Sequence, residues 1–148
     1  MSANIKKYDK LEFLYLVLRL VTALIGIHAL ILGLLNWFFT DYWLKMLQMP
    51  ITGDSPFWPK QSGAMHVGLA FAYGLGAIMP RYLDASLCLI IISKSIAVLF
   101  LYSTFFMHGR ELFVLLAGLV DSSILIVICI FAWRIYQRKH AHSDTIQY

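Results

Sequence analysis

Charged residues are scarce in this chain of 148 residues. Only 14% of the residues are Asp, Glu, Lys or Arg, whereas a soluble domain of ordinary composition has roughly 25%. Hydrophobic residues make up 60% of the chain, and the mean hydropathy is +0.73. The composition therefore predicts a membrane protein in contact with a lipid bilayer. Most basic residues flank apolar segments instead of forming a phosphate-binding face, so a nucleic-acid partner is not expected.

The chain also lacks the motifs of soluble enzymes and of metal sites. It contains no Ser/His/Asp arrangement, no glycine-rich phosphate loop and no His-x-x-x-His pair. The two cysteines, Cys88 and Cys129, lie inside apolar runs and outside any Cys/His cluster with metal spacing, which is typical of packing residues. The sequence therefore indicates no catalytic residue and no metal site, and it favours a non-enzymatic protein.

Four apolar segments are each long enough to approach the ~20 residues that cross a hydrocarbon core. They run from about 11–37, 62–79, 83–106 and 111–133, with a loop at about 38–61 and a tail at 134–148. Short connections after the second and third segments make neighbouring helices antiparallel. We therefore expect an all-α fold, a four-helix up-down bundle in the membrane, with residues 1–148 forming a single domain.

The basic residues of the loops predict the orientation of the bundle. Three lie on one side, namely Lys45, Lys60 and Arg110. Seven lie on the other side: Lys6, Lys7, Lys10, Arg81, Arg134, Arg138 and Lys139. Because the side richer in Lys and Arg is normally cytoplasmic, both termini are expected in the cytoplasm and the long loop outside. A bacterial-type inner membrane fits this arrangement.

Two charges in the middle of apolar segments are the most informative feature. Lys94 and Asp121 each lie about ten or eleven residues into the third and fourth segments, hence near the midplane at 1.5 Å per residue. A lone charge at that depth costs roughly 2.5–3.5 kcal/mol, so we expect an ion pair. The pair is either structural or part of a proton or ion relay, and the structural interpretation is favoured because no second carboxylate lies at this depth.

Arg19 in the first segment either extends back to the cytoplasmic headgroups, the favoured alternative, or reaches toward Asp121.

Two histidines lie in the outer halves of the first two segments. His28 and His66 are candidates for contact with a haem or a quinone, since a bis-imidazole haem site needs two facing histidines at a shared depth. Histidines in a bundle more often hydrogen-bond to each other, to a hydroxyl or to a quinone carbonyl. The isolated chain is therefore expected to hold no cofactor, with haem or quinone as alternatives.

Small residues recur every four positions along the second segment. This stripe, formed by Ala64, Gly68, Ala72 and Gly76, predicts a groove where a neighbouring helix backbone approaches closely. Packing inside the bundle is favoured over a homodimer contact.

Several polar positions resemble the small DoxX-like membrane proteins. The resemblance rests on Leu18-Arg19-Leu20, Met79-Pro80-Arg81, Ser93-Lys94-Ser95 and Gly118-Leu119-Val120-Asp121. It spans the four segments, while the loop at 38–61 has no counterpart. It implies a small subunit of a quinone-linked oxidoreductase or a protein that assembles other membrane proteins, and it assigns no catalytic residue.

The sequence thus favours a non-catalytic auxiliary or assembly subunit of a larger, redox-linked membrane complex, with other membrane protein subunits as partners. The competing function is a self-sufficient redox protein that binds haem or quinone. A small transporter or proton channel is a third class, and the shortage of other intramembrane polar groups argues against it.

Overall fold

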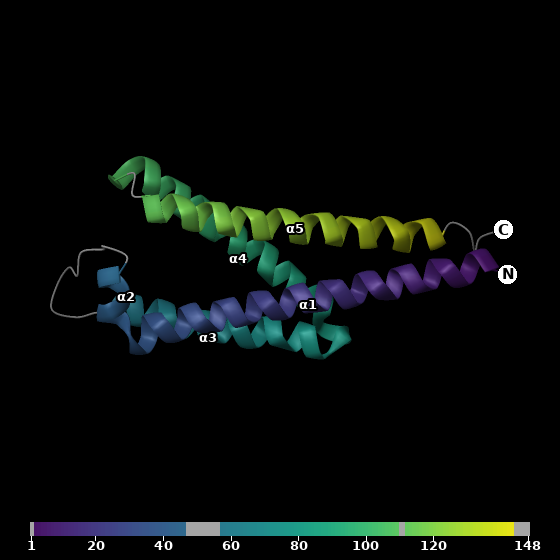
Figure 1. Cartoon of the computed structure of the whole chain (residues 1–148), viewed down its shortest axis with the longest axis horizontal. Coiled ribbons are helices and arrows are strands. Elements are labelled where there is room, and N and C mark those ends of the chain that lie inside the picture. The colour runs from purple at the N-terminus through teal and green to yellow at the C-terminus, as the bar shows by residue number, and fades with distance from the viewer. Residues whose placement is uncertain (1, 47–56, 110–111, 144–148) are drawn as a thin grey trace. The chain divides into compact units, whose positions relative to one another are not determined.

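The structure, a computed structural model, describes residues 2–46, 57–109 and 112–143 (Figure 1). These residues are almost entirely helical, and no strand occurs among them. The helices are α1 (Ser2–Phe38), α2 (Thr40–Met46), α3 (Phe57–Ile78), α4 (Leu83–Thr104) and α5 (Leu112–Ser143). A 3₁₀ turn, η1 (Pro80–Tyr82), precedes α4, and a π-helical turn, η2 (Phe105–Gly109), follows it. The all-α class expected from the sequence is confirmed.

Several helix ends differ from the expected ones because hydropathy marks where a chain leaves lipid and does not mark where a helix stops. α1 begins nine residues before the expected residue 11, and α5 continues ten residues past residue 133. α3 begins at Phe57 inside the expected loop, with Pro59 in its first turn. Proline is tolerated there because the first N–H groups of a helix have no partner within the helix. The short helix α2 also lies inside the expected loop, where the sequence predicts a short interfacial helix at about 41–49.

Three helical stretches among the described residues are long and apolar enough to cross a membrane. They are Glu12–Phe38, Pro80–Met107 and Leu112–Gln137. α3 has 22 residues but is not one of the three. Its glycines and polar residues, such as Gln61, Ser62 and His66, lower its hydropathy. The fold therefore supports a membrane protein with apolar helices in contact with lipid.

The helices pack as two compact units, and each is described by itself. One unit, residues 21–86, contains the second half of α1 together with α2, α3, η1 and the first residues of α4. Its centre is the contact between α1 and α3, where Gly33 and Gly63 allow the two backbones to touch. A Cβ atom on Gly33 would lie 2.9 Å from the carbonyl oxygen of Gly63, and one on Gly63 would lie 2.7 Å from that of Gly33. Such contact requires residues without side chains.

The same unit contains a tight turn from α3 into α4. The buried side chain of Ser86 donates a hydrogen bond to the carbonyl of Ala72, at 2.7 Å. A Cβ atom on Gly76 would lie 2.5 Å from the Cβ of Ser86. Gly76 therefore gives Ser86 the room to reach the α3 backbone, and this polar contact fixes the start of α4 against α3.

The other unit contains residues 1–20 and 87–148. It joins the start of α1 to most of α4 and to α5, and a buried apolar core forms from Leu18, Leu87, Ile90, Val114, Ile128 and Ile135. α4 contains neither glycine nor proline and so has no helix breaker. This regular helix supplies one side of the intramembrane charge site.

Candidate functional site

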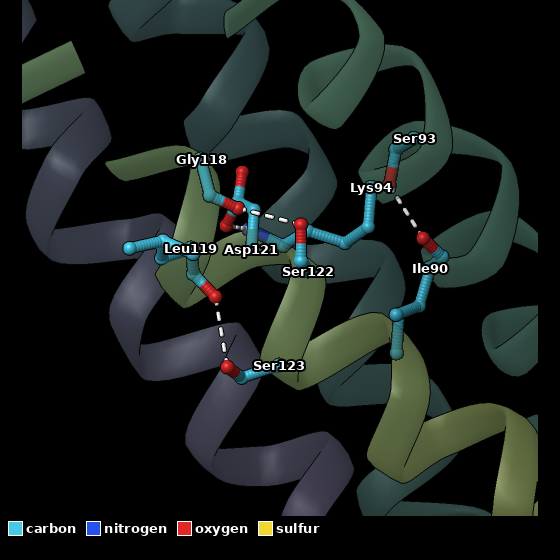
Figure 2. A network of polar contacts seen from close by, with 8 residues as sticks. All are labelled: Ile90, Ser93, Lys94, Gly118, Leu119, Asp121, Ser122 and Ser123. Carbon is cyan, nitrogen blue, oxygen red and sulfur yellow. Dashed lines mark hydrogen bonds and ion pairs between the residues drawn. The ribbon is translucent and has the colours of Figure 1, made fainter. Parts of the chain in front are cut away.

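The central feature of the site is an ion pair between α4 and α5. Lys94 extends from the middle of α4 and its Nζ lies 2.5 Å from Oδ1 of Asp121 on α5 (Figure 2). The two side chains are 12% and 13% exposed. Opposite charges at this distance attract more strongly in a low-dielectric setting than in water. The pair therefore neutralises both charges and ties the two helices together at one register.

The serines around the pair donate hydrogen bonds to their own helices. Ser122 and Ser123 donate to the carbonyls of Gly118 and Leu119, each at 2.8 Å, and Ser93 donates to the carbonyl of Ile90 at 3.1 Å (Figure 2). Bonds of this kind to the preceding turn satisfy a hydroxyl group without a partner on another helix. Lys94 and Asp121 can thus face each other in apolar surroundings without an unpaired hydroxyl hydrogen on these serines.

Tyr102 forms a second contact between α4 and α5, which sequence reasoning missed. Its hydroxyl lies 3.3 Å from Oγ of Ser122. Because Ser122 already donates to Gly118, the tyrosine acts as donor and Ser122 as acceptor. A Cβ atom on Gly118 would lie 3.4 Å and 3.5 Å from two atoms of the tyrosine ring. Gly118 therefore leaves room for the tyrosine ring. The sequence contains many aromatic residues, and no periodic pattern distinguishes Tyr102 from the others.

Arg19 belongs to the same unit as the ion pair. It is half-buried on the N-terminal part of α1, next to the buried Leu18. Away from the ends of its apolar stretches, which carry Glu12 and Arg134, this unit holds two cationic groups, Arg19 and Lys94, and one anionic group, Asp121. Whether Arg19 extends to the headgroups or toward Asp121 stays an open prediction.

His28 and His66 both belong to the unit built on α1 and α3. Gly33 faces Gly63 and Val67, while Gly26 faces Ala70 and Gly74, so the two helices run antiparallel. This register separates the two histidines by about four residues along the helix axes, or about 6 Å at 1.5 Å per residue.

The two histidine rings have different surroundings. Nδ1 of His66 lies 2.8 Å from the carbonyl of Ser62, so it carries the proton and Nε2 is left as the acceptor in a neutral ring. His28 is half-buried, with its Nδ1 shielded from solvent. The hydrogen bond to Ser62 therefore defines the tautomer of His66.

The predicted small-residue groove differs from the helix contact that the structure contains. Ala64 and Gly68 are exposed, and a Cβ atom on Gly68 would meet nothing within 4 Å. Ala72 and Gly76 face the start of α4, through Ser86. The contact with α1 instead uses Gly63, one position before Ala64. A spacing of four residues is shared by several faces of a helix, so it does not determine which face meets a neighbour.

Within the described parts of the chain, no group of three or more His, Cys, Asp or Glu side chains is arranged to hold a metal ion. Comparison with family models, with curated proteins and with solved structures found no match to this chain.

Proposed function

We propose that the chain is a non-catalytic auxiliary or assembly subunit of a larger, redox-linked membrane complex. In this proposal α1, α3, α4 and α5 all cross a bacterial-type inner membrane as an up-down bundle, with both termini in the cytoplasm. The contact between Lys94 and Asp121 carries the proposal. The resemblance to DoxX-like proteins supplies the redox link and the expectation of other membrane proteins as partners.

The argument from the ion pair is electrostatic. A charge that takes part in chemistry or transport must change its protonation or its partner, whereas Lys94 and Asp121 neutralise each other with about one eighth of each side chain exposed. Removing one partner of such a pair is costly, while the intact pair contributes little net stability and fixes helix register. A pair that fixes helix register is what we expect of a non-catalytic subunit.

Co-purification tests this function directly. The full chain, tagged at its C-terminus and extracted in a mild detergent, should bring down one or a few membrane proteins in near-stoichiometric yield, identified by mass spectrometry. A tagged four-helix membrane protein of unrelated sequence, expressed at the same level, is the control. Recovery of the chain alone, with the same background proteins as the control, would overturn the proposal.

The orientation has its own test. A fluorescent reporter at the C-terminus should be bright and a phosphatase reporter at the same place inactive, because the basic flanks hold the C-terminus in the cytoplasm. A phosphatase reporter inserted after Lys45 should be active. The opposite pattern would reverse the bundle in the membrane.

A second candidate function is a redox protein that holds haem or quinone between α1 and α3. The short axial separation of His28 and His66, with Nε2 of His66 left as an acceptor, favours it. Imidazole nitrogens are axial ligands of haem iron. A Soret band in the purified chain that shifts on reduction and disappears in both His28→Ala and His66→Ala would establish haem. Solvent-extractable quinone that falls in His66→Ala would establish quinone, and either result in a preparation free of partners would displace the auxiliary function.

A further inference from the structure

Two pairs of aromatic rings lie at the same end of the α1–α3 contact. Trp37 and Phe38 at the end of α1 stack with ring centroids 5.1 Å apart, and Phe57 and Trp58 at the start of α3 meet edge to face at 5.2 Å. A Cβ atom on Gly63 would lie 2.7 Å from the backbone nitrogen of Trp37, which brings these two helix ends together. Exposed tryptophans and neighbouring aromatics are typical of the lipid headgroup region. This end of the unit therefore lies at headgroup depth.

An open pocket of about 270 Å³ lies at this depth. It is lined by Phe38, Phe39, Thr40, Asp41, Tyr42 and Lys60. The apolar stretch of α1 ends at Phe38, so the pocket begins where the hydrocarbon region ends. Asp41 and Lys60 are both exposed, and they give the pocket one negative and one positive charge. The rings of Phe39 and Tyr42 are also exposed, at 59% and 69%.

Hydrogen bonds fix the backbone next to two pocket residues, Phe39 and Thr40. The buried hydroxyl of Thr40 donates to the carbonyl of Asn36 at 2.5 Å, and Nδ2 of Asn36 donates to the carbonyl of Leu32 at 3.0 Å. The backbone N–H of Trp43 donates to the carbonyl of Phe39 at 2.8 Å, across the bend between α1 and α2. The direction in which Asp41 leaves the backbone is therefore fixed relative to α1.

We propose that this pocket binds the headgroup of a zwitterionic phospholipid. The ammonium of Lys60 binds the phosphate, and the carboxylate of Asp41 binds the ammonium of the headgroup in a charge-assisted contact. The faces of Tyr42 and Phe39 attract the same cation. A headgroup that is only anionic would place its charge beside Asp41 as well as Lys60, so the pocket discriminates against it. This inference is independent of the proposed auxiliary function.

Native mass spectrometry of the full chain tests the inference. The protein is equilibrated in detergent with phosphatidylethanolamine, phosphatidylcholine and phosphatidylglycerol that carry the same acyl chains. Both zwitterionic lipids should remain bound about five- to tenfold more than phosphatidylglycerol, a factor that corresponds to about 1–1.4 kcal/mol, the net contribution of one typical hydrogen bond. Stronger binding of phosphatidylethanolamine than of phosphatidylcholine assigns the leading contact to Asp41, because a quaternary ammonium donates no hydrogen bond. Equal binding of these two lipids assigns the leading contact to the aromatic rings.

Three variants separate the two charges. Asp41→Asn should abolish the preference over phosphatidylglycerol, and Lys60→Met should weaken retention of all three lipids. Lys45→Met, which removes a similar exposed cation on α2 outside the pocket lining, should behave as wild type. Circular dichroism and gel filtration of each variant check that it is folded. Equal binding of phosphatidylglycerol by the wild type, an unchanged preference in folded Asp41→Asn, or unchanged retention of the three lipids in folded Lys60→Met would each overturn the assignment.

Discussion

Gly33 of α1 and Gly63 of α3 approach each other through their backbones. A Cβ atom on either residue would lie within 2.9 Å of the partner's carbonyl oxygen. This separation is shorter than ordinary contact between carbon and oxygen atoms. The two helices therefore cross at a point where neither tolerates a side chain, and the crossing sets the register of the whole α1–α3 pair.

The first prediction is that Gly63→Ala destabilises this pair. The new methyl group would meet the carbonyl of Gly33 and the backbone of Trp37, which are parts of a helix and cannot move aside separately. A loss of about 1–3 kcal/mol is expected, as in other overpacked interiors. Thermal unfolding in detergent, followed by circular dichroism, measures it.

Gly68→Ala is the matched control for this change. It introduces the same methyl group on the same helix, where nothing lies within 4 Å. Alanine should be neutral there or stabilise α3 by up to about 1 kcal/mol, because glycine is the poorer helix former. Equal losses in Gly63→Ala and Gly68→Ala would contradict the crossing at Gly63.

The second prediction concerns Gly76 and Ser86. Gly76→Ala should be strongly destabilising because its methyl group would lie 2.5 Å from the Cβ of Ser86. Ser86→Ala keeps that Cβ and should not relieve the clash, whereas Ser86→Gly removes it. In a double-mutant cycle, Gly76→Ala with Ser86→Gly should therefore lose less stability than the sum of the single changes, by about 1–2 kcal/mol. Additive losses would mean that the two residues do not meet.

The third prediction tests the ion pair. Lys94→Met and Asp121→Asn should each lower stability by about 3–5 kcal/mol, since each leaves one group without its partner in an apolar setting. The double variant should be closer to wild type than either single variant. Chemical unfolding of the purified protein in mixed micelles gives the three values.

Asp41→Asn combined with Lys94→Met provides the control for this cycle. Asp41 is an exposed residue of α2, so its effect should add to that of Lys94→Met without coupling. If Asp121→Asn also adds to Lys94→Met in this way, the two groups are not energetically coupled.

The fourth prediction separates the contribution of the Tyr102 ring to stability from that of its hydroxyl. Tyr102→Phe removes only the hydrogen bond to Ser122 and should cost about 0.5–1.5 kcal/mol. Tyr102→Ala also removes the ring that covers Gly118 and should cost about 3–5 kcal/mol. Thermal unfolding of both variants checks the order. A phenylalanine variant as unstable as the alanine variant would show that the hydroxyl, and not ring packing, dominates.

Matching depth in two neighbouring apolar segments was enough to predict that Lys94 and Asp121 face each other. Depth follows directly from counting residues along a helix, and the cost of a lone charge requires a partner. The serine contacts could not be predicted in the same way, because a hydroxyl is satisfied equally well by its own helix. Tyr102 was missed for a related reason, since an aromatic residue in an apolar run has no pattern that marks its hydroxyl.

The contact between α1 and α3 was harder to predict because it depends on helix rotation. Ala64, Gly68, Ala72 and Gly76 form a regular stripe, yet Gly63 meets α1 while Gly68 faces open space. A helix rotated by one residue turns about 100° and exchanges one face for another. That rotation depends on how the two helices pack in three dimensions, which the spacing of small residues along one helix does not reveal. The helix ends were misplaced for a different reason: α5 continues past its apolar stretch, since charged residues such as Lys and Arg are good helix formers.

The ion pair also determines an order of events during synthesis. Asp121 follows Lys94 by 27 residues, so the cation leaves the ribosome first. At about 5–20 residues per second the carboxylate is made roughly one to five seconds later. During this interval α4 carries an uncompensated charge that opposes its release from the translocon into lipid. α4 and α5 should therefore enter the bilayer together as a hairpin, and a chain truncated before residue 121 should leave α4 poorly inserted.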